Sequence, residues 1–125
     1  MRKAERPISL PLLALRFPIT AITSITHRIT GVVLFVGIGF LLYVLELATS
    51  SPDGYVEAQR LLSEPAGKLI AFGVLATLIF HIVAGIRHLI MDFHIGDSLA
   101  AGRLGSQLVI ASSLGLIALA GVWLW

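Results

Sequence analysis

The stretch HIVAGIRHLIMD, residues 81–92, begins inside an apolar segment and ends among ionisable side chains. His81 follows twelve uncharged residues, Leu69 to Phe80, and is followed by five more before Arg87. An apolar run of this length crosses most of a lipid bilayer, where an ionisable side chain is costly and marks a candidate functional site. The stretch therefore predicts a membrane-spanning helix built around one intramembrane histidine.

Gly85 and His88 lie on the same face of this helix as His81. Gly85, one turn further along, removes a side chain from that face. His88 returns to it after two turns, roughly 10 Å from His81 at about 1.5 Å per residue. A flat group of nanometre size bound by His81 could lie over Gly85 and reach His88 at its edge. Haem combines those dimensions with an iron that accepts imidazole. The alternative is that His81 only hydrogen-bonds a neighbouring helix.

The composition is that of a membrane protein. The chain has 125 residues, of which 57% are hydrophobic and 13% are charged, which lies well outside the usual range of soluble domains. The formal net charge is only +2 and the basic residues are not clustered, so nothing indicates nucleic-acid binding. The chain has no cysteine, which excludes disulfides, thiolate nucleophiles, iron–sulfur ligands and zinc–cysteine sites within it. Residues 2–16 lack the apolar core of a cleavable signal peptide, and we expect none.

Three uncharged segments predict three transmembrane helices, at approximately residues 20–47, 66–92 and 104–125. The first segment, Ile29 to Leu45, is shorter than the roughly 20 residues that span a bilayer, so its helix is expected to begin earlier. After it, turn residues precede a polar stretch, Tyr55 to Glu64, that could form a short surface helix. We therefore expect an all-α membrane protein with a single membrane-anchor domain, residues 1–125.

Basic residues are concentrated on one side of the predicted helices. The first loop carries only Arg60 and Lys68 beside four acidic residues, whereas seven basic residues lie on the other side. The positive-inside rule then places the N-terminus and the second loop in the cytoplasm and the C-terminus outside. In a bacterium this is a multi-pass protein of the inner (cytoplasmic) membrane. The seven basic residues are Arg2, Lys3, Arg6, Arg16, Arg28, Arg87 and Arg103.

A second polar group lies at the cytoplasmic end of the first predicted helix. Ser24, His27 and Arg28 share one helical face, which Gly31 continues. A quinone could use this hydroxyl and this cation, because its carbonyl needs a hydrogen-bond donor and its reduction builds negative charge. Alternatively, Arg28 reaches the lipid headgroups and Ser24 bonds back to its own helix.

No other histidine of the chain is expected at the depth of His81. His27 is placed beside Arg28 at the membrane boundary, and His88 and His94 at or outside it. A six-coordinate haem held by imidazoles would therefore take its second axial ligand from another polypeptide. Three helices also enclose a haem poorly, so we expect the chain to be part of a larger helical bundle.

Two motifs coincide in this chain, SITHRITG at residues 24–31 and HIVAGIRHLIMD at residues 81–92. Together with Arg6-Pro7 and RFPITAI at residues 16–22, they resemble the cytochrome b556 subunits of bacterial succinate dehydrogenase. The resemblance covers nearly the whole chain and includes three helices of matching order with the N-terminus inside. It implies a small membrane anchor that works with a second anchor subunit. Together, the two would hold a flavoprotein and an iron–sulfur protein at the cytoplasmic face.

The resemblance also implies roles for individual residues. His81 matches the axial ligand of haem b, with the other axial ligand on the second anchor subunit. His27 and His88 match positions near the haem propionates. Ser24 and Arg28 match quinone-site residues, so the chain would help to form the site where ubiquinone accepts electrons from the iron–sulfur protein. Succinate itself would be oxidised on the flavoprotein.

Three other interpretations stay open from the sequence. A fumarate reductase anchor would work in the opposite direction, with or without haem. A purely structural anchor would use its polar residues only to set topology. A small transporter subunit would use His81 as a proton relay. Under the cytochrome interpretation, Asp92 is a weaker candidate for a place on a proton route.

Overall fold

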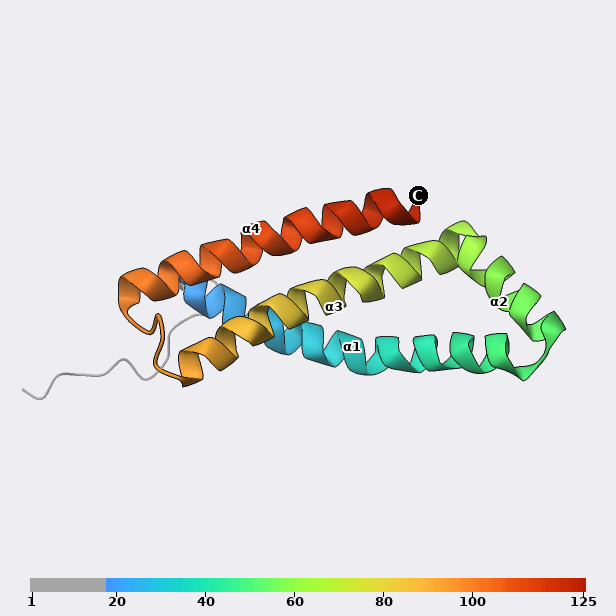
Figure 1. Ribbon diagram of the computed structural model, residues 1–125, viewed down its shortest axis with the longest axis horizontal. Helices are drawn as coiled ribbons and strands as arrows, with labels where there is room; N and C mark the ends of the chain where they lie inside the picture. Colours follow the sequence, from blue (N-terminus) through green and yellow to red (C-terminus); the bar gives the residue numbers. More distant parts are fainter. Residues whose placement is uncertain (1–17) are drawn as a thin grey trace, which may run out of the picture.

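The computed structural model describes residues 18–125, which form four helices (Figure 1). Three are long, α1 (Ile19–Ser50), α3 (Pro65–Asp92) and α4 (Leu99–Leu124), and the short α2 (Pro52–Ser63) connects α1 to α3. In Figure 1, α3 lies between α1 and α4 and runs antiparallel to both, and α2 closes one end of the molecule. Four basic residues used in the orientation argument lie outside the described residues, namely Arg2, Lys3, Arg6 and Arg16.

Local sequence signals set where the helices begin. Pro52 and Pro65 occupy the first turns of α2 and α3, where the N–H that proline lacks would have no partner within the helix. The hydroxyls of Ser51 and Ser98 cap α2 and α4 by accepting a bond from the backbone N–H three residues on, at 2.9 and 3.2 Å. Because Ser98 supplies this cap, α4 begins at Leu99, several residues before the start that the sequence predicts.

The three long helices are each apolar and long enough to cross a membrane. The expected fold class, an all-α membrane protein with three transmembrane helices, is therefore confirmed for the described residues. The polar stretch that was a candidate for a surface helix lies mostly within α2. The cytoplasmic N-terminus and the larger bundle with a second anchor subunit stay predictions.

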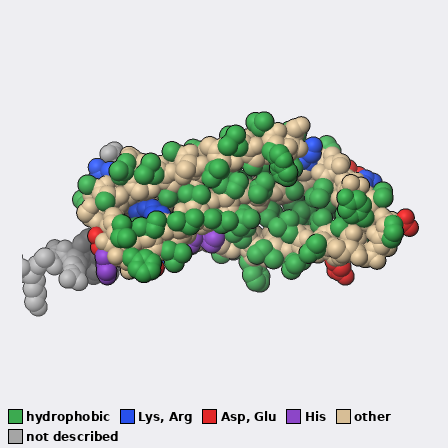
Figure 2. Space-filling view, in the orientation of Figure 1, with side chains coloured by type: hydrophobic (Ala, Val, Ile, Leu, Met, Phe, Trp, Pro, Cys, Tyr) green, Lys and Arg blue, Asp and Glu red, His purple; other side chains and the backbone are tan. Residues whose placement is uncertain are grey.

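Most large apolar side chains of the long helices point outward, as the green side chains in Figure 2 show on one face. Phe35, Leu119 and Val122 expose 84%, 66% and 80% of their surface. Continuous apolar surface of this extent indicates contact with lipid or with other helices. Within the described part of the chain, the buried apolar side chains are few: Leu34, Val44, Ala58, Val74, Ala84 and Val109.

The contact between α1 and α3 that positions the candidate site depends on Gly37. This residue is buried against Val74 of α3, and a Cβ atom added to it would lie 2.9 and 3.1 Å from the two Val74 methyl carbons. Val74 is β-branched, so it has little freedom to turn away. Gly39 lies two residues further along α1, and an added Cβ there would meet none of the described atoms within 4 Å.

We expect Gly37→Ala to lower the stability of the chain relative to Gly39→Ala. Overpacking a helix contact costs about 1–3 kcal/mol. Both variants gain the same helix propensity, about 1 kcal/mol for alanine over glycine, so their comparison isolates the clash with Val74. The measurement is the thermal unfolding midpoint of each variant in detergent. Equal midpoints would mean that α1 and α3 do not pack at Gly37.

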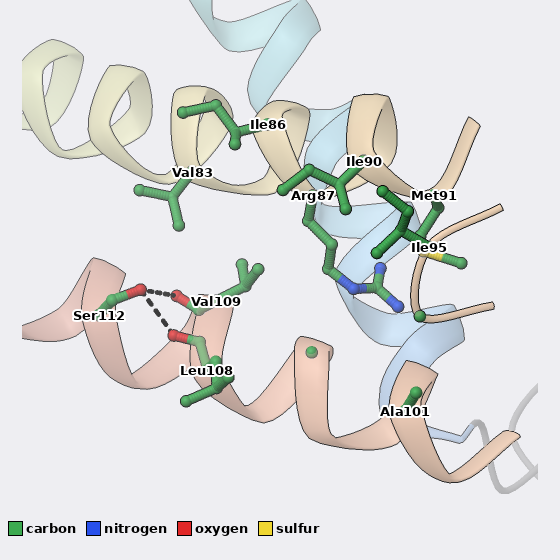
Figure 3. Close-up of a pocket in the computed structure, with 12 residues that line it drawn as sticks. Val83, Ile86, Arg87, Ile90, Met91, Ile95, Ala101, Leu108, Val109 and Ser112 are labelled. Carbon is green, nitrogen blue, oxygen red and sulfur yellow. Dashed lines mark hydrogen bonds between the residues drawn. The ribbon is translucent and has the colours of Figure 1, made fainter. Parts of the chain in front are cut away.

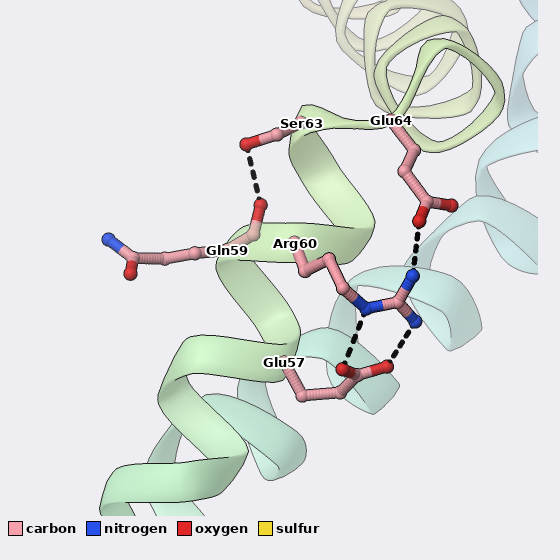
Figure 4. A network of polar contacts seen from close by, with 5 residues as sticks. All are labelled: Glu57, Gln59, Arg60, Ser63 and Glu64. Carbon is pink, nitrogen blue, oxygen red and sulfur yellow. Dashed lines mark hydrogen bonds and ion pairs between the residues drawn. The ribbon is translucent and has the colours of Figure 1, made fainter.

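An exposed ion-pair network stabilises α2 (Figure 4). The Nε–H of Arg60 donates to Glu57 at 2.8 Å, and the other guanidinium nitrogens bond the second Glu57 oxygen and Glu64. The hydrogen bond from Arg60 lowers the pKa of the Glu57 carboxyl. Glu57 and Glu64 are both engaged by Arg60 at the surface.

Removal of the guanidinium should return the pKa of Glu57 towards its ordinary value. In the wild-type chain the stabilisation from this carboxylate is complete above its ordinary pKa and is lost as the pH falls through the lowered one. The effect on stability is small because the pair is exposed. NMR titration of the Glu57 carboxyl in wild type and Arg60→Gln measures the change, with Lys68→Gln as the charge-matched control. An unchanged Glu57 pKa in Arg60→Gln would contradict the pairing.

Candidate functional site

Three histidines from two helices stack where α1 meets α3. The ring centroid of His27, on α1, lies 4.0 Å from that of His81 on α3, with 11° between the ring planes. It lies 4.8 Å from the centroid of His88, also on α3, with 21° between the planes. His81 and His88 are two turns apart, so the His27 ring lies between them. The fold thus gathers all three histidines that the two sequence motifs contain.

Two glycines make room for these rings. A Cβ atom at Gly31 would lie 3.3 Å from Cε1 of His81, and one at Gly85 would lie 3.4 Å from Nε2 of His27. Both distances are at or below the tight end of van der Waals contact, so a larger residue at either position would displace an imidazole. The two glycines therefore form a cradle for flat groups on the facing surfaces of α1 and α3.

The position of His27 corrects one prediction. The sequence places His27 at the membrane boundary, away from His81, and puts a flat ligand over Gly85. This separation is wrong, because the His27 ring itself lies over Gly85. Gly31 of α1 faces His81 of α3. Because the two helices are antiparallel, the backbone of His27, one turn before Gly31, is level with Gly85, one turn after His81. The His27 side chain therefore reaches the notch, which is the space left by the absent side chain of Gly85. Counting residues from the membrane boundary in each helix could not reveal this contact, because such a count does not show how α1 and α3 are aligned with each other.

The hydrogen bonds of His81 define its tautomer. Its Nδ1 lies 3.1 Å from the backbone oxygen of His27 and 3.0 Å from the hydroxyl oxygen of Thr30. A carbonyl oxygen only accepts hydrogen bonds, so Nδ1 carries the proton and donates it. In the neutral ring the lone pair is then on Nε2, for which residues 18–125 offer no hydrogen-bond partner. An imidazole whose Nδ1–H is held by a backbone carbonyl is the usual state of a metal-ligating histidine.

His88 is oriented in the same manner. Its Nδ1 lies 2.8 Å from the backbone oxygen of Ala84, one turn earlier in α3, and must donate to it. The Nε2 of His88 is consequently an acceptor when the ring is neutral and a donor when it is protonated. Two histidines on one face of α3 thus have oriented rings whose outer nitrogens have no hydrogen-bond partner among residues 18–125.

Ser24, Arg28 and Asp92 lie towards the end of the molecule where α3 ends and α4 begins. Ser24 and Asp92 line a hollow of about 390 Å³, together with His88 and Arg87. Ser24 is half-buried, whereas Arg28 is exposed and is not among the residues that line this hollow. The structure therefore brings Ser24 to the α3 motif, while the Arg28 side chain lies on the outer surface of α1.

Arg87 connects α3 to α4. Its guanidinium donates to the backbone oxygen of Gly102 at 3.1 Å, and a Cβ at Gly105 would lie 3.0 Å from its Nε. It also borders a mostly apolar pocket of about 310 Å³ between α3 and α4, with Val83 and Leu108 among the lining residues (Figure 3). In the sequence, Arg87 marks the membrane boundary and forms with His88 the basic pair at the end of the second motif, and its contact with α4 was not predicted. The glycines at 102 and 105 were the available signal that α4 accepts a large side chain.

The comparison with known families decides the assignment. A model of the family described as succinate dehydrogenase/fumarate reductase transmembrane subunit matches residues 2–120. The chain belongs to this family. The resemblance drawn from its motifs is confirmed, and so is its place as a multi-pass protein of the bacterial inner membrane.

Two bacterial relatives are similar over nearly their full length, and a third relative over about two thirds of its length. The succinate dehydrogenase cytochrome b556 subunit of Coxiella burnetii is 41% identical over 123 residues, 98% of both chains. The cytochrome b556 subunit of Paracoccus denitrificans is 35% identical over 119 residues, 95% of this chain and 92% of the relative. The cytochrome b560 subunit of Reclinomonas americana is 35% identical over 93 residues, 70% of this chain and 65% of the relative.

Proposed function

We propose that this chain is the haem b-binding anchor of a succinate:ubiquinone oxidoreductase and helps to form the site of quinone reduction. The observation that carries the proposal is His81, an intramembrane imidazole with Nδ1–H held by a carbonyl and Nε2 free among the described residues. The names of the two bacterial relatives, both cytochrome b556 subunits of succinate dehydrogenase, support it.

The residues around His81 fit a haem. The Nδ1–H of His81 is engaged by a carbonyl, which leaves Nε2 for iron, and the space over Gly85 that the His27 ring fills would take a flat macrocycle if that ring turned away. Haem, when bound, supplies an iron that changes oxidation state by one electron. His81 would hold the iron, and His27 and His88 would lie near the propionates. For a macrocycle to lie over Gly85, the His27 ring must turn away from that residue. The stacking energy lost is about 1 kcal/mol per stacked pair. This loss is small beside the energy of a metal–ligand bond.

The second axial ligand is assigned to a second anchor subunit. His27 stacks face to face on His81. Imidazole lone pairs lie in the ring plane, so two stacked rings direct their nitrogens side by side and not towards one metal between them. In the stacked arrangement His27 does not form an axial pair with His81. The assignment of the second ligand to another polypeptide rests on the resemblance to cytochrome b556 subunits, which implies a second anchor subunit.

The quinone site is assigned to Ser24 and Arg28. The Ser24 hydroxyl can donate a hydrogen bond to a quinone carbonyl, and the Arg28 cation can stabilise the negative charge that reduction places on the quinone oxygens. Ser24 lies at a hollow next to His88, near the proposed haem edge. Electrons would arrive from an iron–sulfur subunit at this face, and succinate would be oxidised on a flavoprotein subunit that this chain does not contain. Asp92, at the rim of the same hollow, is proposed for proton supply.

A fumarate reductase anchor is the second candidate, because the matching family includes both enzymes. Affinity purification of the tagged chain from its native membrane separates the possibilities. We expect a flavoprotein, an iron–sulfur protein and a second small membrane protein to co-purify with a b-type optical spectrum, and succinate to reduce ubiquinone. Preparations that contain these partners but no haem would refute the haem assignment. Fumarate reduction by a quinol at a rate above succinate oxidation would favour the second candidate.

A further inference from the structure

Thr30 belongs to the SITHRITG motif but has no role in the function proposed so far. Its hydroxyl donates to the backbone oxygen of His27 at 2.8 Å, and its oxygen lies 3.0 Å from Nδ1 of His81. The second contact joins residues 51 positions apart on different helices. Thr30 thus touches the proposed iron ligand on the side opposite to the nitrogen that would bind the metal.

The bond from the Thr30 hydroxyl to a backbone oxygen of its own helix is of a common kind, whereas its contact with His81 is not. Thr49 on the same helix also donates to a backbone oxygen of the preceding turn, that of Leu45, at 2.8 Å. Such bonds satisfy a hydroxyl within its own helix and need no function. Among the described residues, Thr30 is the only hydroxyl that also contacts an imidazole of another helix. Its role therefore has to be sought at His81.

The direction of the hydrogen bonds follows from the two contacts. The Thr30 hydrogen points to the His27 oxygen, so the hydroxyl presents a lone pair to His81. Both groups that face Nδ1, the Thr30 hydroxyl and the His27 carbonyl, are then acceptors. They hold the proton on Nδ1 and resist rotation of the ring, because a ring flip would place a carbon atom against two oxygens.

We propose that Thr30 is a positioning residue for His81. The Thr30 hydroxyl accepts the Nδ1–H bond together with the His27 carbonyl, and it helps to set the orientation and electron donation of the iron ligand. This inference rests on the proposed haem ligation by His81. Acceptors on the outer nitrogen of a metal-bound imidazole raise its basicity and tune the metal. A more basic imidazole stabilises ferric over ferrous iron, so the Thr30 bond lowers the midpoint potential of the haem.

The test compares Thr30→Val, which replaces the hydroxyl by a methyl group of similar size, with Thr30→Ser, which keeps the hydroxyl. Thr49→Val is the matched control on the same helix. Each variant is purified as the whole complex. In Thr30→Val we expect haem affinity to fall by about 10-fold, the lower end for loss of a partner of a metal ligand, and the midpoint potential to shift to a more positive value. Thr30→Ser and Thr49→Val should match the wild type.

Haem release to apomyoglobin and a redox titration of the b-type absorbance provide the two readouts, neither of which needs turnover. Thr30→Ala also lacks the hydroxyl and introduces no added bulk, and it gives the same comparison if the valine variant does not assemble. Wild-type haem affinity and potential in the variants that lack the hydroxyl would overturn the inference. A parallel His81→Ala complex that keeps the native haem spectrum would instead refute the ligand assignment itself.

Discussion

His81→Ala should remove most of the haem b from the purified complex. Loss of a group that only supports a metal ligand lowers affinity by about 10- to 100-fold, so loss of the ligand itself should exceed that range. The Nδ1–H of His81 is held by the His27 carbonyl, which leaves Nε2 as its metal-binding atom. The measurement is haem per complex from the reduced-minus-oxidised optical spectrum.

The controls use the other histidines. His94→Ala removes an exposed imidazole in the loop before α4 and should leave the haem content unchanged. The His27 ring is only 4.0 Å from that of His81, so it is near enough to replace a missing ligand. Any haem that His81→Ala retains should show an altered spectrum and should disappear when His27 is also replaced by alanine. A native spectrum and potential in His81→Ala would contradict the assignment.

The fold could be predicted from the sequence because its determinants are local. Apolar length predicts α1, α3 and α4, and the turn residues after α1 followed by a polar stretch indicate α2. The predicted start of a helix is less accurate where a capping residue and a charged residue indicate different starting points. The sequence suggests that α4 starts after Arg103, but the Ser98 cap starts it earlier and places Arg103 within the helix.

The site could be predicted only as far as single helices allow. Spacing along α3 places His81, Gly85 and His88 on one face. Spacing along α1 groups His27 with Ser24 and Arg28 instead, and only the family resemblance places His27 near the haem. The stack of His27 on His81 and the contact of Thr30 with the same ring depend on the register between α1 and α3. That register is set by close contacts such as Gly37 with Val74, which no periodicity in one helix reveals.

Arg28→Leu should slow ubiquinone reduction about 10-fold or more while the flavoprotein still passes electrons from succinate to a soluble dye. In enclosed sites, removing one preorganised group that stabilises developing negative charge lowers the rate by about 100- to 1,000-fold. Arg28 is exposed, so we expect a smaller loss of rate. No carboxylate among residues 18–125 pairs with Arg28, so its charge is available to a quinone.

The control for Arg28 is Arg103→Leu, which removes an exposed cation from the start of α4 on the same side of the membrane. If Arg28 acts on the quinone, the two variants differ: Arg103→Leu keeps quinone reduction, and Arg28→Leu loses it without losing haem, since haem is held at His81. If Arg28 is only a boundary charge that reaches the lipid headgroups, both variants behave alike. Equal quinone turnover in the two variants would therefore remove Arg28 from the quinone site and leave the haem assignment intact.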